Sequence, residues 1–158
     1  MSIDNELRAA LLDYLNNPHT HASLIDAVKN LPEKYYNEKP AGLAYSFWDQ
    51  LEHIRICQRD MLDFMVNPNY KEIQWPKDYW PKAGGKADKK MWDESIARYK
   101  KDAESMKKII SDPSVDLLAK IPHGSGQTVF REILQVIDHN SYHIGQFILL
   151  RKLIGEWK

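Results

Sequence analysis

Apolar residues recur at steps of three and four along most of the chain, and this spacing constrains the fold more than any other feature. Near the N-terminus it aligns Leu7, Leu11 and Leu15 on one face of a segment, as in an amphipathic helix. The same spacing predicts helices over 3–16, 18–31, 43–66, 87–110 and 128–154. No run shows convincing strand alternation. The pattern predicts an all-α fold, a four-helix bundle with a short extra N-terminal helix.

Proline and glycine mark the connections between these helices. Asn17-Pro18 interrupts the first pattern, because proline biases the preceding residue away from helical angles. The composition of 32–42 indicates a loop, and two longer connections follow at 67–87 and 111–126. The first of these contains WPKDYWPKAGG. Long connections in compact domains are often functional, and Thr128 is expected to cap the last helix.

Size and charge narrow the class of protein. The 158 residues fit one domain, expected over 1–158. Lys plus Arg and Asp plus Glu number 22 each, so the chain lacks the overall basic charge typical of nucleic-acid binding. The longest stretch without a charged residue, 139–150, is too short and polar to span a bilayer, and the N-terminus lacks a signal-peptide pattern. Because Cys57 is the single cysteine, no intrachain disulfide can form. We expect a cytoplasmic protein that binds neither nucleic acid nor membrane.

Two histidines stand four residues apart in DHNSYHIGQ, residues 138–146. Successive helical residues turn by about 100°, so His139 and His143 are offset by about 40° and lie one turn apart. Both are expected on the shoulder of the helix's apolar face, with Gln146 beside them. Two imidazoles in this arrangement can approach one metal ion from one helix.

Two histidines do not complete a metal site, because a structural metal needs four protein ligands and a catalytic one often has three plus an open position. His53, in WDQLEHIRICQRD, is the best third candidate, since it too is expected on the shoulder of an apolar helix face. His19 and His21 are expected on different sides of a helix, and His123 in an exposed loop. The alternative is that His53, His139 and His143 are only hydrogen-bonded at the edge of a core.

The spacing argues against other chemistries. A zinc protease of the HExxH type needs Glu after the first histidine, where this chain has Asn140. Ferritin-like di-iron bundles need Glu-x-x-His pairs, and none of the six histidines has Glu three residues before it. Cys57 lies one turn after His53, so a Cys/His pair is conceivable. A lone cysteine on an apolar flank is more often a small core residue, although Cys57 could still approach a metal.

Four stretches resemble the DinB-like superfamily of metal-dependent bundle proteins. They are SFWDQLEHIRICQRDMLDF (46–64), WPKDYWP (75–81), GQTVFREIL (126–134) and DHNSYHIGQFILLRKLIG (138–155). The resemblance covers most of residues 20–155. It implies a four-helix bundle in which His53, His139 and His143 bind one divalent metal. It also implies a homodimer and, for some relatives, the transfer of low-molecular-weight thiols.

These observations and the resemblance predict a metal-dependent enzyme that acts on a small molecule, such as a thiol S-transferase or a hydrolase. Zinc or nickel is expected first, with iron or manganese as alternatives, because imidazole selects weakly among them. The alternatives are a non-catalytic metal-binding or stress-response sensor, and a dimeric interaction module with structural histidines. Asp49, Asp60, Gln146 and, less directly, Asp138 are candidates to orient the ligands. The WPKDYWP segment is expected either to wall the site or to cover the end of the bundle.

Overall fold

The computed structural model describes residues 2–17 and 19–157, which contain α-helices, short 3₁₀ turns and no strand longer than a single bridge. The all-α prediction is confirmed. The α-helices are α1 (Ile3–Asn16), α2 (Leu24–Val28), α3 (Phe47–Val66), α4 (Lys89–Ser111) and α5 (Val129–Leu153). The 3₁₀ turns are η1 (Glu33–Tyr35), η2 (Pro40–Gly42) and η3 (Lys77–Tyr79).

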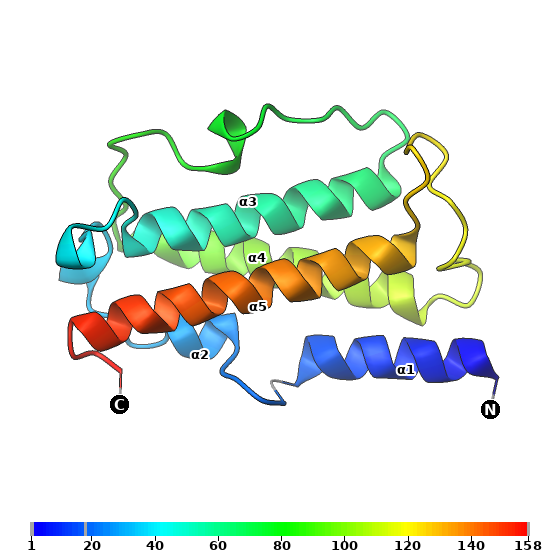
Figure 1. Ribbon diagram of the computed structural model, residues 1–158, viewed down its shortest axis with the longest axis horizontal. Helices are drawn as coiled ribbons and strands as arrows, with labels where there is room; N and C mark the ends of the chain where they lie inside the picture. The colour runs from blue at the N-terminus through cyan, green and yellow to red at the C-terminus, as the bar shows by residue number, and fades with distance from the viewer. Residues whose placement is uncertain (1, 18, 158) are drawn as a thin grey trace.

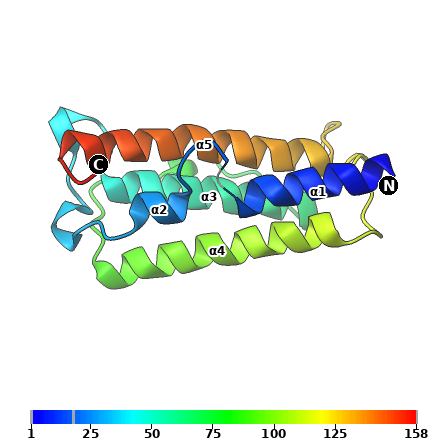
Figure 2. The same ribbon diagram turned by 90° about the horizontal axis from the view of Figure 1, so that it is seen from below.

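Three long helices, α3, α4 and α5, form the body of the bundle, and α1 and α2 lie in line along its remaining side (Figures 1 and 2). α1 and α2 together therefore take the place of the fourth helix of the bundle, which is interrupted between them. The predicted helix over 18–31 is confined to α2, because Ser23 and Asp26 form a capping box that starts a new helix at Leu24. The helix ends at Val28, because the next residue, Lys29, leaves the helical conformation at a ψ of 133°.

Capping side chains also set the ends of the helices that carry the site. The helix predicted from residue 43 begins at Phe47, because Ser46 accepts a hydrogen bond from the backbone N–H of Asp49 and the Asp49 carboxylate accepts one from that of Ser46. Thr128 caps α5 as predicted, accepting from the backbone N–H of Arg131.

The connection from α3 to α4 runs the length of the bundle. Figure 1 shows that α3 and α4 start at the same end, so the chain between them must return along α3. A helix of 20 residues such as α3 is about 30 Å long. This distance explains the length of the segment 67–88, which passes over the outer side of α3 and carries η3 with it.

The core consists of two apolar clusters with a polar layer between them. One cluster contains Phe47 and Phe147, and the other contains Met106 and Ile133. Between the two, the buried amide of Gln58 accepts a hydrogen bond from Asn140 and donates one to the Tyr99 carbonyl. The polar layer therefore crosses α3, α4 and α5 near the middle of the bundle, at the level of the three predicted ligands.

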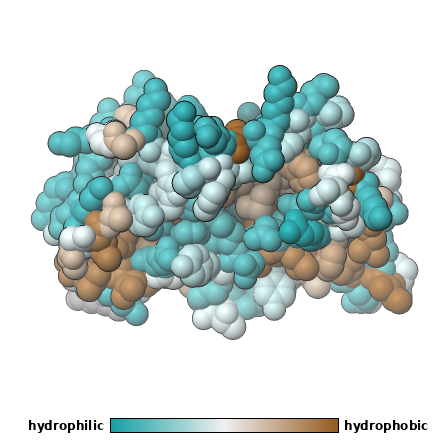
Figure 3. All heavy atoms as spheres, turned by 45° about the horizontal axis from the view of Figure 1, so that its top comes forward, coloured by the Kyte–Doolittle hydropathy of each residue, from teal (hydrophilic) through white to brown (hydrophobic). Residues whose placement is uncertain are grey.

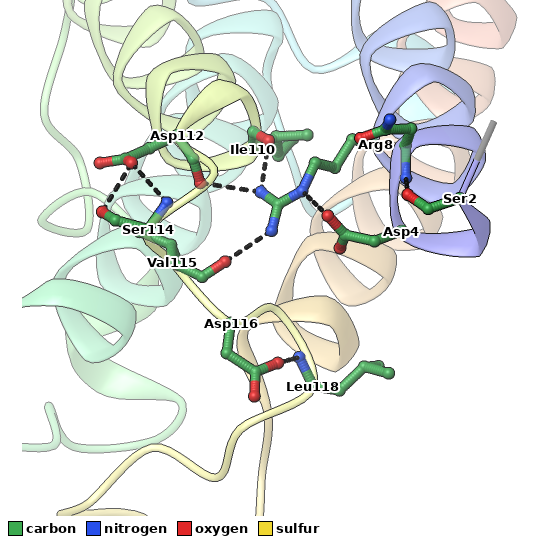
Figure 4. Close-up of polar contacts among 10 residues, drawn as sticks. Ser2, Asp4, Arg8, Ile110, Asp112, Ser114, Val115, Asp116 and Leu118 are labelled. Atoms are coloured by element: carbon green, nitrogen blue, oxygen red, sulfur yellow. Dashed lines mark hydrogen bonds and ion pairs between the residues drawn. The ribbon is translucent and has the colours of Figure 1, made fainter.

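A buried arginine holds α1 against the bundle (Figure 4). The Arg8 guanidinium donates to the carbonyls of Ile110, Asp112 and Val115 at 2.8, 2.9 and 2.6 Å, and to Asp4 at 2.7 Å. A positive charge at the C-terminus of α4 is favourable, because the helix ends in unpaired carbonyls. Arg151 makes the equivalent contact to the end of α2, donating to the Ala27 and Lys29 carbonyls.

Apolar side chains gather in two groups along the lower part of the face in Figure 3, and hydrophilic ones cover most of its upper part. Within residues 2–17 and 19–157, every helix is too short or too polar to cross a membrane.

Candidate metal centre

Three imidazoles from two helices converge on the middle of the bundle. The Nε2 atom of His53, on α3, lies 3.2 Å from that of His143 and 3.3 Å from that of His139, both on α5. One ligand atom from each ring lies within 4.8 Å of the other two. His53 is 2% exposed and His143 is 9% exposed, whereas His139 is partly buried. The structure therefore brings together the three residues that the sequence singled out.

Hydrogen bonds fix which nitrogen of two of these rings carries the proton. His53 Nδ1 lies 2.7 Å from the Tyr79 carbonyl, and His143 Nδ1 lies 2.9 Å from Gln146 Oε1 and 3.2 Å from Gln50 Oε1. These oxygens only accept, so each Nδ1 must donate. In a neutral imidazole the other nitrogen, Nε2, then has a lone pair and no hydrogen.

Two lone pairs therefore face each other across 3.2 Å, an unfavourable arrangement unless a cation lies between them. Bonds of about 2.0–2.1 Å at tetrahedral angles separate two zinc-bound nitrogens by about 3.3 Å. The Nε2–Nε2 distances of 3.2 and 3.3 Å match that separation. The chemistry and spacing of these donors fit a divalent metal.

Protonation does not relieve the contact at neutral pH. Burial, followed by the neighbouring imidazoles, lowers the pKa of His143 to about 4. Burial and the proximity of His53 likewise lower the pKa of His139 to about 4. Burial also lowers the pKa of His53, against an opposing effect of the Tyr79 carbonyl. All three rings are neutral near pH 7, which is the form that binds metal.

The 67–88 connection forms one wall of the site. Trp80 stacks on the His53 ring at a centroid distance of 3.9 Å, and Tyr45 stacks on the other side of Trp80 at 4.1 Å. With the Tyr79 carbonyl, these contacts fix the plane and tautomer of His53. Of the two roles expected for WPKDYWP, the structure supports the wall.

A cleft of about 270 Å³ opens beside the histidines. Asp60 lies in it and accepts hydrogen bonds from the hydroxyls of Tyr70 and Tyr79, both at 2.9 Å. Burial and this carboxylate raise the pKa of both tyrosines. Asp60 thus fastens the connection to α3 and does not touch an imidazole. The other residues that line the cleft are Cys57, Met61, Trp75 and Gln135.

Cys57 lies beside the histidines and outside their ligand cluster. Its Sγ is 3.5 Å from Nδ1 and 3.8 Å from Nε2 of His53. Burial, assisted by Asp60, raises the pKa of the thiol to about 12. The thiol is therefore protonated at neutral pH, and only its thiolate would be a good nucleophile or metal ligand.

The remaining histidines lie away from the site. His19 and His21 follow α1 in a non-helical stretch, so their expected placement on a helix is wrong. His19 pairs with Asp13 at 2.9 Å, and His21 contacts a neighbouring carbonyl. His123 is exposed and donates to the Phe64 carbonyl.

Among the candidates for orienting the ligands, Gln146 contacts His143, whereas Asp49 belongs to the cap of α3 and Asp138 is exposed. Trp80 belongs to the segment that was expected to wall the site, but three contacts were not predicted from the sequence, which are that of Gln50, that of the Tyr79 carbonyl and the stacking of Trp80 on His53. Gln50 could have been found, because it lies three residues before His53 and therefore on the same face of α3. The other two depend on the path of a long connection.

The chain was compared with known protein families, curated proteins and solved structures. A profile of the DinB superfamily matches residues 19–147, which span α2 to most of α5 and contain all three histidines. No curated protein and no solved structure matches the chain. The family profile covers well over half of the sequence, and the chain therefore belongs to the DinB superfamily.

Proposed function

We propose that this protein binds one divalent metal ion through His53, His139 and His143. The observation that carries the proposal is the pair of Nε2 atoms that face each other at 3.2 Å while both Nδ1 atoms donate to carbonyl oxygens. Buried polar groups in folded proteins are normally paired, so a contact between two acceptors calls for a ligand. A cation satisfies both lone pairs at once.

Zinc or nickel is the metal that we propose first, with iron or manganese as alternatives. Neutral imidazole suits zinc, nickel and iron, and it binds manganese more weakly. No carboxylate belongs to the cluster of three within the described part of the chain, and a hard cation such as magnesium prefers oxygen.

We further propose that the site is catalytic and acts on a small molecule, as a thiol S-transferase or a hydrolase. A divalent metal on three neutral imidazoles keeps its charge and an open position, and it lowers the pKa of a water or thiol that binds there. The cleft supplies room beside the ligands. Trp75 and Met61 give it apolar surface, and Gln135 can hydrogen-bond a polar substrate group.

Metal analysis is the first test. Purified protein should contain close to one equivalent of a transition metal by elemental mass spectrometry, and His53→Ala and His143→Ala proteins should contain almost none. His123→Ala serves as the matched control, because this exposed histidine lies outside the cluster. If both triad variants keep wild-type stoichiometry, the proposed ligands are wrong.

Catalysis needs a separate test, with metal-loaded protein assayed against a panel of low-molecular-weight thiols and electrophiles and against hydrolysable esters and amides. Turnover that disappears in His143→Ala would support an enzyme. A protein that binds metal without turnover across the panel would favour the non-catalytic metal-binding or stress-response sensor.

A homodimer is also proposed, and a cytoplasmic location stays a prediction. Support for the dimer comes from α5, whose exposed side includes Leu134, Tyr142, Leu149 and Leu153 at helical spacing. Light scattering on the wild-type protein should give twice the mass of one chain, and Leu149→Glu should give the mass of a single chain. A wild-type mass of a single chain would contradict the dimer.

A further inference from the structure

The amide of Asn140 has its orientation fixed by a chain of hydrogen bonds through the polar layer. The Tyr99 carbonyl only accepts, so Gln58 must direct its Nε2 toward that oxygen, at 2.9 Å. Gln58 Oε1 then accepts from Asn140 Nδ2 at 3.0 Å. With its nitrogen used in this way, Asn140 has its Oδ1 left over as a free acceptor.

That oxygen and one histidine nitrogen are the two buried side-chain atoms without a hydrogen-bond partner among residues 2–17 and 19–157. They are Asn140 Oδ1 and His139 Nδ1, and they belong to neighbouring residues of α5. Asn140 is 7% exposed. An unpaired buried polar atom destabilises a fold, because it has given up its hydrogen bonds to water without replacing them. One is an acceptor and the other is a potential donor, so a single hydrogen bond would satisfy both.

We propose that Asn140 is a positioning residue whose Oδ1 accepts the Nδ1–H of His139 and thereby directs the His139 Nε2 toward the metal. Burial is the main influence on the pKa of His139 and lowers it, and the side chain of Asn140 is near enough to the ring to act in the opposite direction. His53 and His143 have their counterparts in the Tyr79 carbonyl and the two glutamine amides. Asn140 supplies the third.

This role of Asn140 rests on the proposed metal function, and it determines which charges surround the metal. All three Nδ1–H groups then bond neutral oxygens, and none bonds a carboxylate. Histidine ligands of many metal sites instead donate to carboxylates, which increase the electron density of the ring. Here neither the three imidazoles nor the oxygens that they contact carry a negative charge that would offset the charge of the metal. The open position therefore favours an anionic fourth ligand, such as a thiolate or a hydroxide.

The test compares two variants that break the same hydrogen bond from opposite ends. Asn140→Leu and Gln58→Leu both remove the contact between Asn140 and Gln58, and only the first removes the acceptor for His139. Loss of a ligand's hydrogen-bond partner typically weakens metal binding about 10–100-fold. By competition with a chromophoric chelator, Asn140→Leu should bind zinc about 10–100-fold more weakly than wild type. Gln58→Leu should lose clearly less affinity, because Asn140 keeps its acceptor although its amide is freer to rotate.

Two further measurements keep the proposal falsifiable if Asn140→Leu folds poorly. Asn140→Asp retains an acceptor and should bind zinc at least as tightly as wild type. Long-range ¹H–¹⁵N correlation spectra of the apoprotein at pH 8 should show His139 with its proton on Nδ1. A proton on Nε2, zinc binding by Asn140→Asp as weak as by Asn140→Leu, or equal losses in Asn140→Leu and Gln58→Leu would each overturn it.

The apoprotein spectrum also separates this inference from the proposed function. A wild-type protein that binds no zinc, nickel, iron or manganese would contradict the metal site itself. The tautomer of His139 would still report on Asn140 in that protein. If Asn140 Oδ1 bonds only solvent, through the cavity lined by Tyr14, Leu24 and Tyr99, zinc affinity will not depend on residue 140, and the inference fails.

Discussion

Arg8 and the histidine cluster are two buried polar groups of opposite character. Each joins segments far apart in the sequence. Every hydrogen bond of Arg8 runs from a donor to an acceptor, and its partners are three carbonyls at or just beyond the end of α4 and one carboxylate. In the histidine cluster, two acceptors, the Nε2 atoms of His53 and His143, face each other at 3.2 Å.

The completeness of its hydrogen bonding separates a structural polar group in a core from a functional one. A fully paired group such as Arg8 is complete within the chain and stabilises the fold. A group whose donors and acceptors do not match is complete only with something that the chain does not contain. The same criterion leads to opposite expectations when the two groups are mutated.

His143→Leu should have the largest effect, and only on metal binding. Losing one of three ligands should weaken zinc binding by more than about 100-fold, measured by chelator competition. The free energy of unfolding of the apoprotein should stay within about 1 kcal/mol of wild type, because the change also removes a contact between two lone pairs. An apoprotein destabilised as strongly as by loss of Arg8 would show that the histidines are structural.

Arg8→Met should have the reverse profile. It leaves three carbonyls at or just beyond the end of α4 without their donor and should lower the free energy of unfolding by about 2–3 kcal/mol. Zinc stoichiometry and affinity should not change. Arg98→Met is the control, because Arg98 is 64% exposed and pairs with Glu94 at 3.6 Å, so its loss should cost less than about 0.5 kcal/mol. Urea denaturation of the wild-type, Arg8→Met and Arg98→Met apoproteins measures these free energies of unfolding.

The sequence predicted the histidine cluster better than it predicted the Arg8 contact, for physical reasons. A ligand pair on one helix follows from 3.6-residue periodicity, and the third histidine lies on the shoulder of another apolar face. Arg8 instead reaches carbonyls at the end of another helix, more than 100 residues away in the sequence. No pattern in the sequence around Arg8 predicts that contact. The break between α1 and α2 was also underestimated, since the apolar spacing continues past Ser23 although the capping box restarts the helix there.

The pH dependence should distinguish the two groups again. In the unfolded chain the histidine pKa is about 6.5, whereas in the fold those of His139 and His143 are about 4. The unfolded state therefore binds more protons between these values. Stability of the apoprotein should be full above about pH 6.5 and fall as the pH is lowered toward 4. Melting temperatures from pH 7.5 to 5 should drop by several degrees.

Replacing both residues, in His139→Gln/His143→Gln, should flatten this decline. The penalty of Arg8→Met should be the same at both ends of the range, because arginine does not titrate there. If the double variant loses stability with acid as steeply as wild type, the low histidine pKa values are not its source.

Asp60 gives the smallest and sharpest test, because it lies in the cleft with the histidines and yet is paired like Arg8. Both of its oxygens accept tyrosine hydroxyls at 2.9 Å. Its complete hydrogen bonding therefore predicts a structural role for Asp60, although its position in the cleft would suggest a role at the metal. Asp60→Asn should lower the free energy of unfolding by about 1 kcal/mol, because one tyrosine loses its acceptor, and leave zinc affinity within about 3-fold of wild type. A loss of zinc comparable to that of His143→Leu would mean that position in the cleft, and not completeness of pairing, identifies the groups that serve the metal.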